Sequence, residues 1–148
     1  MPREIRLSAD DLNLMSIFHA VSGASPRDCI VDEQMNRIIF IVSPGEMAKA
    51  IGKKGAHVQQ MERLMGRPVE VVEYAETPES LVKKALGEKY VSEVRVVEKL
   101  DGRRSIVAVV SPKNKKFVIG RGGRNVSRAR LICQRYFEIS DIQVVTQA

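Results

Sequence analysis

The sequence is poor in the side chains on which catalysis and metal binding most often depend. Its 148 residues include two histidines, two cysteines and no tryptophan, and only 5% are aromatic. Neither His19 nor His57 has a second ligand at metal spacing, and no Ser/His/Asp set is evident. Cys29 and Cys133 lie far apart and outside any CxxC pattern, so we expect two buried thiols in a reducing compartment. These absences argue against a metal site, a disulfide framework and a hydrolase.

The glycine-rich stretches also lack the spacing of nucleotide-binding loops. Six residues separate Gly45 from Gly52, and Lys54 stands where a Walker A loop needs serine or threonine. The stretch Gly120-Arg121-Gly122 is followed by Asn125 where a dinucleotide fingerprint needs glycine. We therefore expect no catalytic residue, no metal and no cofactor.

Long apolar runs are absent as well. The longest, Ile38 to Val42, is far too short to cross a bilayer, and the charged start from Met1 to Arg6 does not resemble a signal peptide. Hydrophobic residues make up 44% of the chain, which is ordinary for a globular protein, and the scarcity of aromatic residues implies an aliphatic core. We expect a soluble, cytoplasmic protein that makes no membrane contact.

Positive charge is what the sequence has in excess. The formal net charge is +6 at pH 7, and the isoelectric point is about 9.5. Residues 1–75 hold 9 Lys/Arg and 10 Asp/Glu, whereas residues 76–148 hold 15 and 8. Because the excess lies in the second half, it favours a polyanionic partner over a general aid to solubility. A solvated basic face is the plainer interpretation of the same charge.

The two halves repeat one another at an offset of 68 residues. Ser43-Pro44 aligns with Ser111-Pro112, and Ile51-Gly52 aligns with Ile119-Gly120. Each half is predicted to run helix, strand, strand, short helix, glycine turn, helix, strand. The expected ranges are 9–22, 29–31, 37–42, 46–51, 56–65 and 69–73, then 79–87, 91–100, 103–110, a short basic helix, 124–138 and 142–145. Asp101-Gly102 predicts a two-residue hairpin turn between the strands of the second half.

A Gly-x-x-Gly turn with basic middle residues lies in each half. It runs from Gly52 to Gly55 in the first and from Gly120 to Gly123 in the second. Glycines at this spacing let the chain reverse between two helices and bring its backbone close to a ligand. The next helix begins at the turn, where its amides and dipole attract anions. One such turn is typical of a helix end, but two in register predict contacts with a sugar-phosphate backbone.

The helix after the second turn is predicted to have a basic side and an apolar side. Between Lys113 and Arg135 the sequence has eight Lys/Arg and no Asp or Glu. At about 100° per residue, Arg124, Arg128 and Arg135 fall on one side of this helix. The opposite side carries Val126, Ala129, Cys133 and Phe137. Leu131 lies among the basic residues and is either an apolar contact for a base or simply exposed.

The order of a strand, a short helix, an Ile-Gly-x-x-Gly turn and a longer helix resembles the KH domain. A helix and a strand before this core, rather than after it, are similar to the prokaryotic type II form. Two such domains with almost no linker resemble the tandem KH core of the NusA family of transcription factors. Bacterial members carry a polymerase-binding domain and an S1 domain ahead of this core. Here residue 8 already begins the first KH helix, which is similar to the short archaeal form.

The resemblance implies an α+β fold of two type II KH domains in tandem, residues 1–75 and 76–148, each a three-stranded mixed sheet covered by helices. It implies a non-catalytic transcription termination or elongation factor that holds single-stranded RNA beside each turn. The RNA-binding residues are then expected to be Ile51, Gly52, Lys53, Lys54, Gly55, Lys115, Lys116, Ile119, Gly120, Arg121, Gly122, Gly123, Arg124 and Arg128.

Two questions stay open at the level of the sequence. A ribosome-associated or RNA-processing KH adaptor is the alternative function, because KH domains also occur in such proteins. The less basic first turn either extends the same RNA track or mainly braces the pair of domains. RNA polymerase is a further candidate partner, and a monomer is expected.

Overall fold

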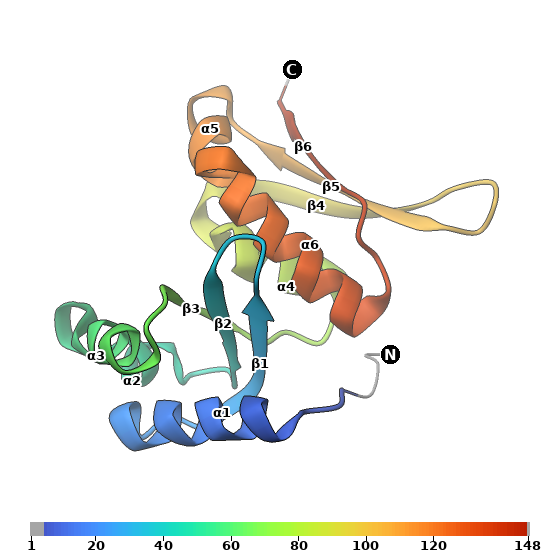
Figure 1. Cartoon of the computed structure of the whole chain (residues 1–148). Coiled ribbons are helices and arrows are strands. Elements are labelled where there is room, and N and C mark those ends of the chain that lie inside the picture. The colour runs from blue at the N-terminus through green and yellow to red at the C-terminus, as the bar shows by residue number, and fades with distance from the viewer. Residues whose placement is uncertain (1–4, 148) are drawn as a thin grey trace. The chain divides into compact units, whose positions relative to one another are not determined.

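The computed structural model describes residues 5–147, which form two compact units that divide between Tyr74 and Ala75. Each unit contains three strands and three α-helices in the order that the sequence predicts (Figure 1). The fold is therefore the predicted α+β arrangement of two units, each with a three-stranded mixed sheet, as the resemblance to type II KH domains implies. The predicted domain boundary lies one residue beyond the division between the units.

In the first unit the strands form a sheet of order β1-β2-β3. Its elements are α1 (Ala9–Ser22), β1 (Pro26–Asp32), β2 (Arg37–Val42), α2 (Met47–Ile51), α3 (Ala56–Met65) and β3 (Val69–Glu73). β2 pairs antiparallel with β1 and parallel with β3. Because parallel neighbours cannot be joined by a tight turn, the chain crosses from β2 to β3 through α2 and α3. The Gly-x-x-Gly turn lies in the middle of that crossover.

The second unit repeats this topology in the order β4-β5-β6. Its elements are α4 (Pro78–Leu86), β4 (Val91–Glu98), β5 (Arg104–Val110), α5 (Lys115–Ile119), α6 (Arg124–Phe137) and β6 (Ile142–Thr146). β5 pairs antiparallel with β4 and parallel with β6. Both antiparallel pairs also carry a register shift near one end, between Pro26 and Asp28 and between Val91 and Glu93. A shared irregularity of this kind supports duplication more strongly than shared topology alone.

Signals in the local sequence explain where two of the helices begin. The Ser8 hydroxyl accepts a hydrogen bond from the Asp11 amide at 3.1 Å, and the Asp11 carboxylate accepts one from the Ser8 amide at 3.0 Å. This reciprocal pair is a capping box, which satisfies amides that would otherwise lack a partner. Thr77 caps α4 with a single hydrogen bond, in which the Ser80 amide donates to its Oγ1 at 3.2 Å, and Pro78 begins the helix.

The first core is formed where the helices pack on one face of β2. Phe18 of α1 and Phe40 of β2 are fully buried, with ring centroids 4.3 Å apart. Ala50 of α2 and Met61 of α3 close the same cluster. The two short helices that flank the first turn are therefore anchored through buried side chains, which fixes the turn to the sheet.

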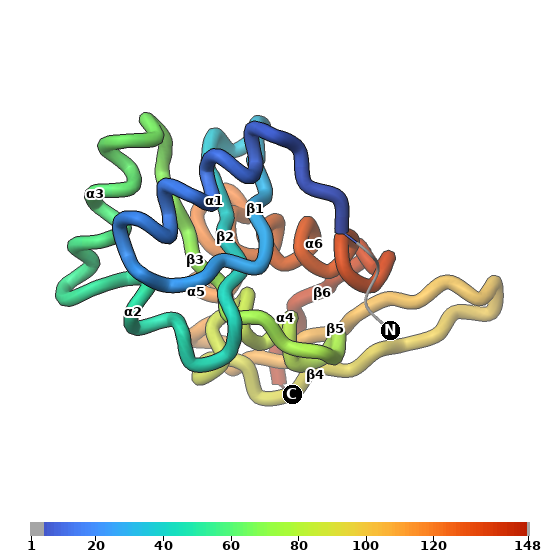
Figure 2. Tube along the Cα trace, turned by 90° about the horizontal axis from the view of Figure 1, so that it is seen from below, coloured from blue at the N-terminus to red at the C-terminus, as the bar shows by residue number. Residues whose placement is uncertain are grey.

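The β4–β5 hairpin extends beyond the helices of its own unit (Figures 1 and 2). Its turn corrects a prediction, because the Lys99 amide donates to the Arg103 carbonyl at 2.7 Å. That pairing leaves a loop of three residues, from Leu100 to Gly102, instead of the predicted two-residue turn. Gly102 has φ 87°, as the last position of a three-residue hairpin loop requires. The Asp-Gly pair did mark the turn, but not its length.

Candidate nucleic-acid interface

The first Gly-x-x-Gly turn is a short 3₁₀ segment, η1 (Lys53–Gly55), between α2 and α3. Its backbone has positive φ at three places: 78° at Gly52, 55° at Lys54 and 75° at Gly55. Positive φ is easy for glycine and unfavourable for lysine, by about 1 kcal/mol. Lys54 therefore holds a strained conformation that places it at the tip of the turn.

The second turn, η4 (Arg121–Gly123), reproduces this backbone between α5 and α6. Gly120 has φ 84° and ψ 165°, against 78° and 170° at Gly52. Gly122 and Gly123 have φ 62° and 79°, which match the values of the corresponding residues in the first turn within a few degrees. Here the middle left-handed position is occupied by glycine, so the second turn has the same shape without the strain at Lys54.

The first glycine of each turn is required by a neighbouring residue of the protein itself. A Cβ on Gly52 would lie 2.6 Å from Cγ of His57, and one on Gly120 would lie 2.8 Å from the Asn125 nitrogen. Distances below 3.0 Å force atoms to move, so neither position accepts a side chain. The sequence argument assigned all these glycines to the approach of a ligand. For Gly52 and Gly120 the structure gives a different cause, which is internal packing.

His57 and Asn125 make equivalent hydrogen bonds across the two turns. The His57 Nδ1 lies 2.8 Å from the carbonyl oxygen of Lys49, and Asn125 Nδ2 donates to the carbonyl oxygen of Phe117 at 3.0 Å. Each bond ties the first turn of the longer helix back to the short helix before the glycines. The sequence did not reveal this role, although the two polar residues stand 68 positions apart, in register with the repeat.

The other glycines leave open space. A Cβ built on Gly55 or Gly122 would meet no described atom within 4 Å, and one on Gly123 would only touch Val126 at 3.9 Å. Gly55 and Gly123 are also the N-cap residues of α3 and α6. Because a glycine cap has no side-chain oxygen, it leaves the amides of the first helical turn accessible to an external anion.

The predicted cations surround these open positions. Lys53 and Lys54 in the first turn and Arg121 in the second are exposed, as are Lys115 and Lys116 of α5. Half-buried residues complete the predicted set: Ile51, Ile119, Arg124 and Arg128. The predicted residues thus form two groups, one from the end of α2 through the first turn and one from α5 through the second turn into α6, each within its own unit.

One predicted residue has an internal role that the sequence did not indicate. The guanidinium of Arg128 donates to the Ala85 carbonyl, from Nη2 at 2.6 Å and from Nε at 3.2 Å. Ala85 lies in the last turn of α4, where carbonyl groups lack partners within the helix. Arg128 therefore joins α6 to the C-terminal end of α4. Further along the same helix, Arg130 donates to the Ile142 carbonyl at 2.9 Å.

The apolar side predicted for α6 is confirmed. Val126, Ala129, Cys133 and Phe137 are buried. Leu131, predicted among the basic residues, is 37% exposed.

Burial raises the pKa of the Cys133 thiol to about 12, against an ordinary value of 9.0, because the low-dielectric interior penalises the thiolate. Cys29 is buried in the first unit. Both thiols thus occupy core positions, as the sequence predicted.

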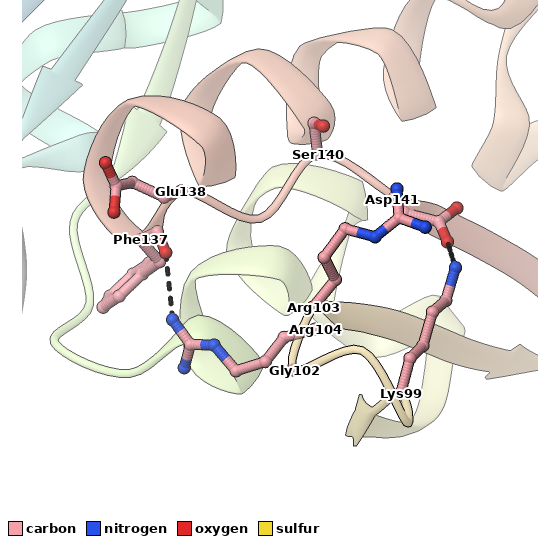
Figure 3. A pocket seen from close by; sticks show the side chains of 8 residues that line it. All are labelled: Lys99, Gly102, Arg103, Arg104, Phe137, Glu138, Ser140 and Asp141. Atoms are coloured by element: carbon pink, nitrogen blue, oxygen red, sulfur yellow. Dashed lines mark hydrogen bonds and ion pairs between the residues drawn. The ribbon is translucent and has the colours of Figure 1, made fainter.

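A hollow of about 450 Å³ lies elsewhere in the second unit, between the β4–β5 hairpin and the segment that joins α6 to β6 (Figure 3). It is lined by Lys99, Gly102, Arg103, Arg104, Phe137, Glu138, Ser140 and Asp141. Two of the basic side chains in its wall are paired with oxygen atoms of the protein. Lys99 Nζ lies 3.0 Å from Asp141 Oδ2, and Arg104 Nη2 donates to the Phe137 carbonyl at 3.0 Å. With two carboxylates in its wall, this hollow matches a polyanion poorly.

Within residues 5–147, no group of three or more His, Cys, Asp or Glu side chains is arranged to hold a metal ion. No helix in this part of the chain is long and apolar enough to span a bilayer. Both Gly-x-x-Gly turns, by contrast, combine an open glycine position with exposed positive charge.

Comparisons with known proteins agree with this geometry. The KH domain family matches residues 15–76. The "Probable transcription termination protein NusA" of Halobacterium salinarum is 36% identical over 140 residues, which are 95% of this chain and 98% of that protein. A protein of the same name from Methanocaldococcus jannaschii is 26% identical over 145 residues, 97% of this chain and 77% of its own. The crystal structure of APE1850 matches with a TM-score of 0.84 and 35% identity, and covers 94% of this chain and 100% of that one.

Proposed function

We propose that this chain, which belongs to the family of short archaeal NusA-like proteins, acts in transcription termination or elongation by holding single-stranded RNA on its two Gly-x-x-Gly turns. The members of this family are RNA-binding transcription factors with tandem KH domains. We assign the two KH domains to residues 1–75 and 76–148. In this proposal the protein is a non-catalytic, cytoplasmic monomer, and RNA polymerase is its second partner.

One observation carries the proposal: the same turn is built twice with nearly the same dihedral angles, and its second half is open in both copies. A turn that served only to end a helix would not need exposed cations beside open glycines. The sugar-phosphate backbone of RNA needs both, because its charge must be neutralised and its atoms must approach the protein backbone closely.

The residues proposed to contact RNA fall into three kinds. Open glycines and adjacent helix amides receive phosphate at Gly55, Gly122 and Gly123. The exposed cations are Lys53, Lys54, Lys115, Lys116 and Arg121, with Arg124 at the first position of α6. Ile51 and Ile119 are half-buried next to the turns and offer apolar contact to a sugar or base. Gly52, Gly120 and Arg128 support the shape of the turns and the placement of α6 in addition to any contact of their own.

The experiment is a comparison of single-stranded with duplex RNA. Fluorescence anisotropy with a labelled 12-nucleotide RNA should show tighter binding to the single strand, and affinity should fall as salt rises because phosphate neutralisation releases counterions. A loop that clamps an exposed sugar-phosphate backbone with splayed bases cannot hold an A-form duplex in the same way. Equal affinity for both forms would contradict binding through these turns.

The alternative function is a KH adaptor of the ribosome or of RNA processing. The family relationship favours transcription, because the two relatives described above carry the name of a termination protein. Affinity purification of the tagged protein from its own cells separates the two. Recovery with RNA polymerase supports the transcription role, and recovery with ribosomal subunits alone overturns it.

A further inference from the structure

An exposed aromatic side chain stands beside the second turn. Phe117, in α5, is 58% exposed, whereas every other aromatic side chain of the chain, all within the described residues, is buried or half-buried. At the 68-residue offset its counterpart in the first unit is Lys49. Leaving a phenylalanine in water forgoes the free energy of burying it. A protein with few aromatic residues has nevertheless placed one on the surface next to the turn that lies in its more basic half.

Phe117 is held in place from two sides. Its ring packs edge-on against Tyr90 of η2 (Glu88–Tyr90), with centroids 4.6 Å apart and an interplanar angle of 63°. Its carbonyl accepts the hydrogen bond from Asn125, which ties it to the first turn of α6. Gly87 makes room for the tyrosine, because a Cβ there would lie 3.1 Å from the Tyr90 ring. The aromatic pair is therefore a fixed surface, joined directly to the turn.

Several cations lie near this pair, in the sequence or in space. Lys115, Lys116 and Arg121 are exposed within four residues of Phe117, and Lys89 Nζ lies 5.4 Å from the centroid of the Tyr90 ring. A bare apolar patch would suit another protein, but an aromatic patch accompanied by cations suits a planar base that carries phosphate. Packing against Tyr90 alone does not account for the patch, because more than half of the Phe117 surface stays in solvent.

We propose that Phe117, braced by Tyr90, is a stacking platform for one base of the single-stranded RNA whose backbone lies on the second turn. This rests on the proposed function of that turn and adds a contact that the turn itself does not provide. Every base has a π-face, so the platform adds affinity without selecting a sequence. The first unit, with Lys49 in the equivalent position, has no such contact to offer.

The test uses the full chain and fluorescein-labelled 12-nucleotide oligouridine. Phe117→Ala should weaken binding about tenfold, the effect of losing one base–aromatic stack. Phe117→Tyr should bind within about twofold of the wild type, and Phe117→Leu should lose most of the affinity, because stacking needs a ring. Leu100→Ala is the matched control: Leu100, at the tip of the β4–β5 hairpin, is fully exposed, and its loss should change nothing. The salt dependence of Phe117→Ala should equal that of the wild type, because no phosphate contact is removed.

A second probe removes the bases. On a 12-nucleotide strand of abasic ribose phosphate, wild type and Phe117→Ala should bind equally. In the wild type, photocrosslinking with 5-iodouridine RNA should label Phe117 or Tyr90, which needs no variant and so does not depend on a variant's folding. The platform is overturned if Phe117→Ala loses as much affinity for the abasic strand as it loses for oligouridine. It is also overturned if the crosslinks are confined to other residues.

Two further outcomes separate this inference from the function on which it rests. If Phe117→Ala binds oligouridine like the wild type while Arg121→Asp/Gly122→Asp binds weakly, the platform is wrong and the turn stands. If both variants bind like the wild type, both the RNA-binding role of the second turn and the stacking role of Phe117 are wrong.

Discussion

The two turns share one backbone conformation but differ in the charge of the residues around them. In the window from Gly45 to Arg67, which includes the first turn, five Lys/Arg are offset by two Asp/Glu. The equivalent window from Lys113 to Arg135 has eight Lys/Arg and no acidic residue. The dihedral angles nonetheless agree within about ten degrees at every positive-φ position. Shape and charge therefore vary independently in this duplicated fold.

The comparison also shows what the shape depends on. Each turn needs a glycine at its first position, because His57 or Asn125 reaches back over it to a carbonyl of the short helix. The middle position is less demanding, since Lys54 and Gly122 both hold positive φ there. The close approach of His57 or Asn125 leaves no room for a Cβ at one end of the turn, while the other end is open to solvent.

The largest expected effect is on stability. Gly120→Ala should lower the free energy of unfolding by about 3 kcal/mol. The new Cβ would meet the Asn125 backbone, and the dihedral angles of residue 120 are nearly exclusive to glycine. Gly52→Ala should cost a similar amount. Urea unfolding followed by circular dichroism measures both. Gly122→Ala is the control, with open space at the Cβ and an expected cost of only about 1 kcal/mol. Equal costs at Gly120 and Gly122 would show that the clash with Asn125 is not what fixes the turn.

The next effect separates the two turns by charge. Replacing both Arg121 and Gly122 with aspartate should weaken binding to single-stranded RNA about 30-fold, roughly 2 kcal/mol. The same change at Lys53 and Lys54 should weaken it less, about fivefold, although it alters the net charge by one unit more. Aspartate tolerates positive φ, so both backbones accept the change. The reverse ranking in an anisotropy titration would mean that the first turn is the main RNA contact.

A pH experiment tests the core behind the second turn. The pKa of the Cys133 thiol is about 12 in the folded protein and near 9.0 when the chain is unfolded. Below pH 9 both states hold the proton, and between pH 9 and 12 only the folded state does. Stability should therefore fall as pH rises through this range, by about 1.4 kcal/mol per pH unit from this group. Cys133→Ala should show a shallower decline, since lysines and tyrosines titrate in both proteins. Parallel curves would contradict the burial of this thiol.

The smallest effect concerns the middle of the turn. Gly122→Lys makes the second turn resemble the first and should cost about 1 kcal/mol of stability, because lysine must adopt positive φ. Lys54→Gly should relieve a similar strain but raises the entropy of the unfolded chain, so its net gain should stay below about 1 kcal/mol. Thermal unfolding of both variants checks the pair. A destabilising Lys54→Gly would show that this lysine has a structural contact that outweighs its strain.

The repeated order of helices and strands followed from sequence because it depends on local periodicity and on punctuation by glycine and proline. The buried side of α6 followed for the same reason, as Val126 and Ala129 show. The offset of 68 holds from β2 to the second turn, whereas the first strands of the two units align at 65, since Pro26 corresponds to Val91. After it α6 is 14 residues long against 10 for α3, so Val69, which pairs with Ile38, corresponds to Ile142, which pairs with Ile106.

The features that the sequence did not predict depend on contacts between distant segments. A helical wheel places Arg128 on the basic side of α6, but it contains nothing about the Ala85 carbonyl, which belongs to another helix. The bonds of His57 and Asn125 cross a turn of positive φ, which no periodic pattern describes. The matching register of these two residues was the one available signal. Phe117 gave none, because exposure of a single aromatic residue is a property of the folded surface.

The central claim is that single-stranded RNA lies on both turns and on the second more tightly. Its most direct test is an NMR titration of the isotope-labelled chain with a 12-nucleotide single-stranded RNA, following the backbone amides of residues 52–55 and 120–123. We expect both sets of resonances to shift, with those of residues 120–123 reaching saturation at the lower RNA concentration. Shifts confined to other parts of the chain, with both turns unchanged at saturation, would contradict the claim.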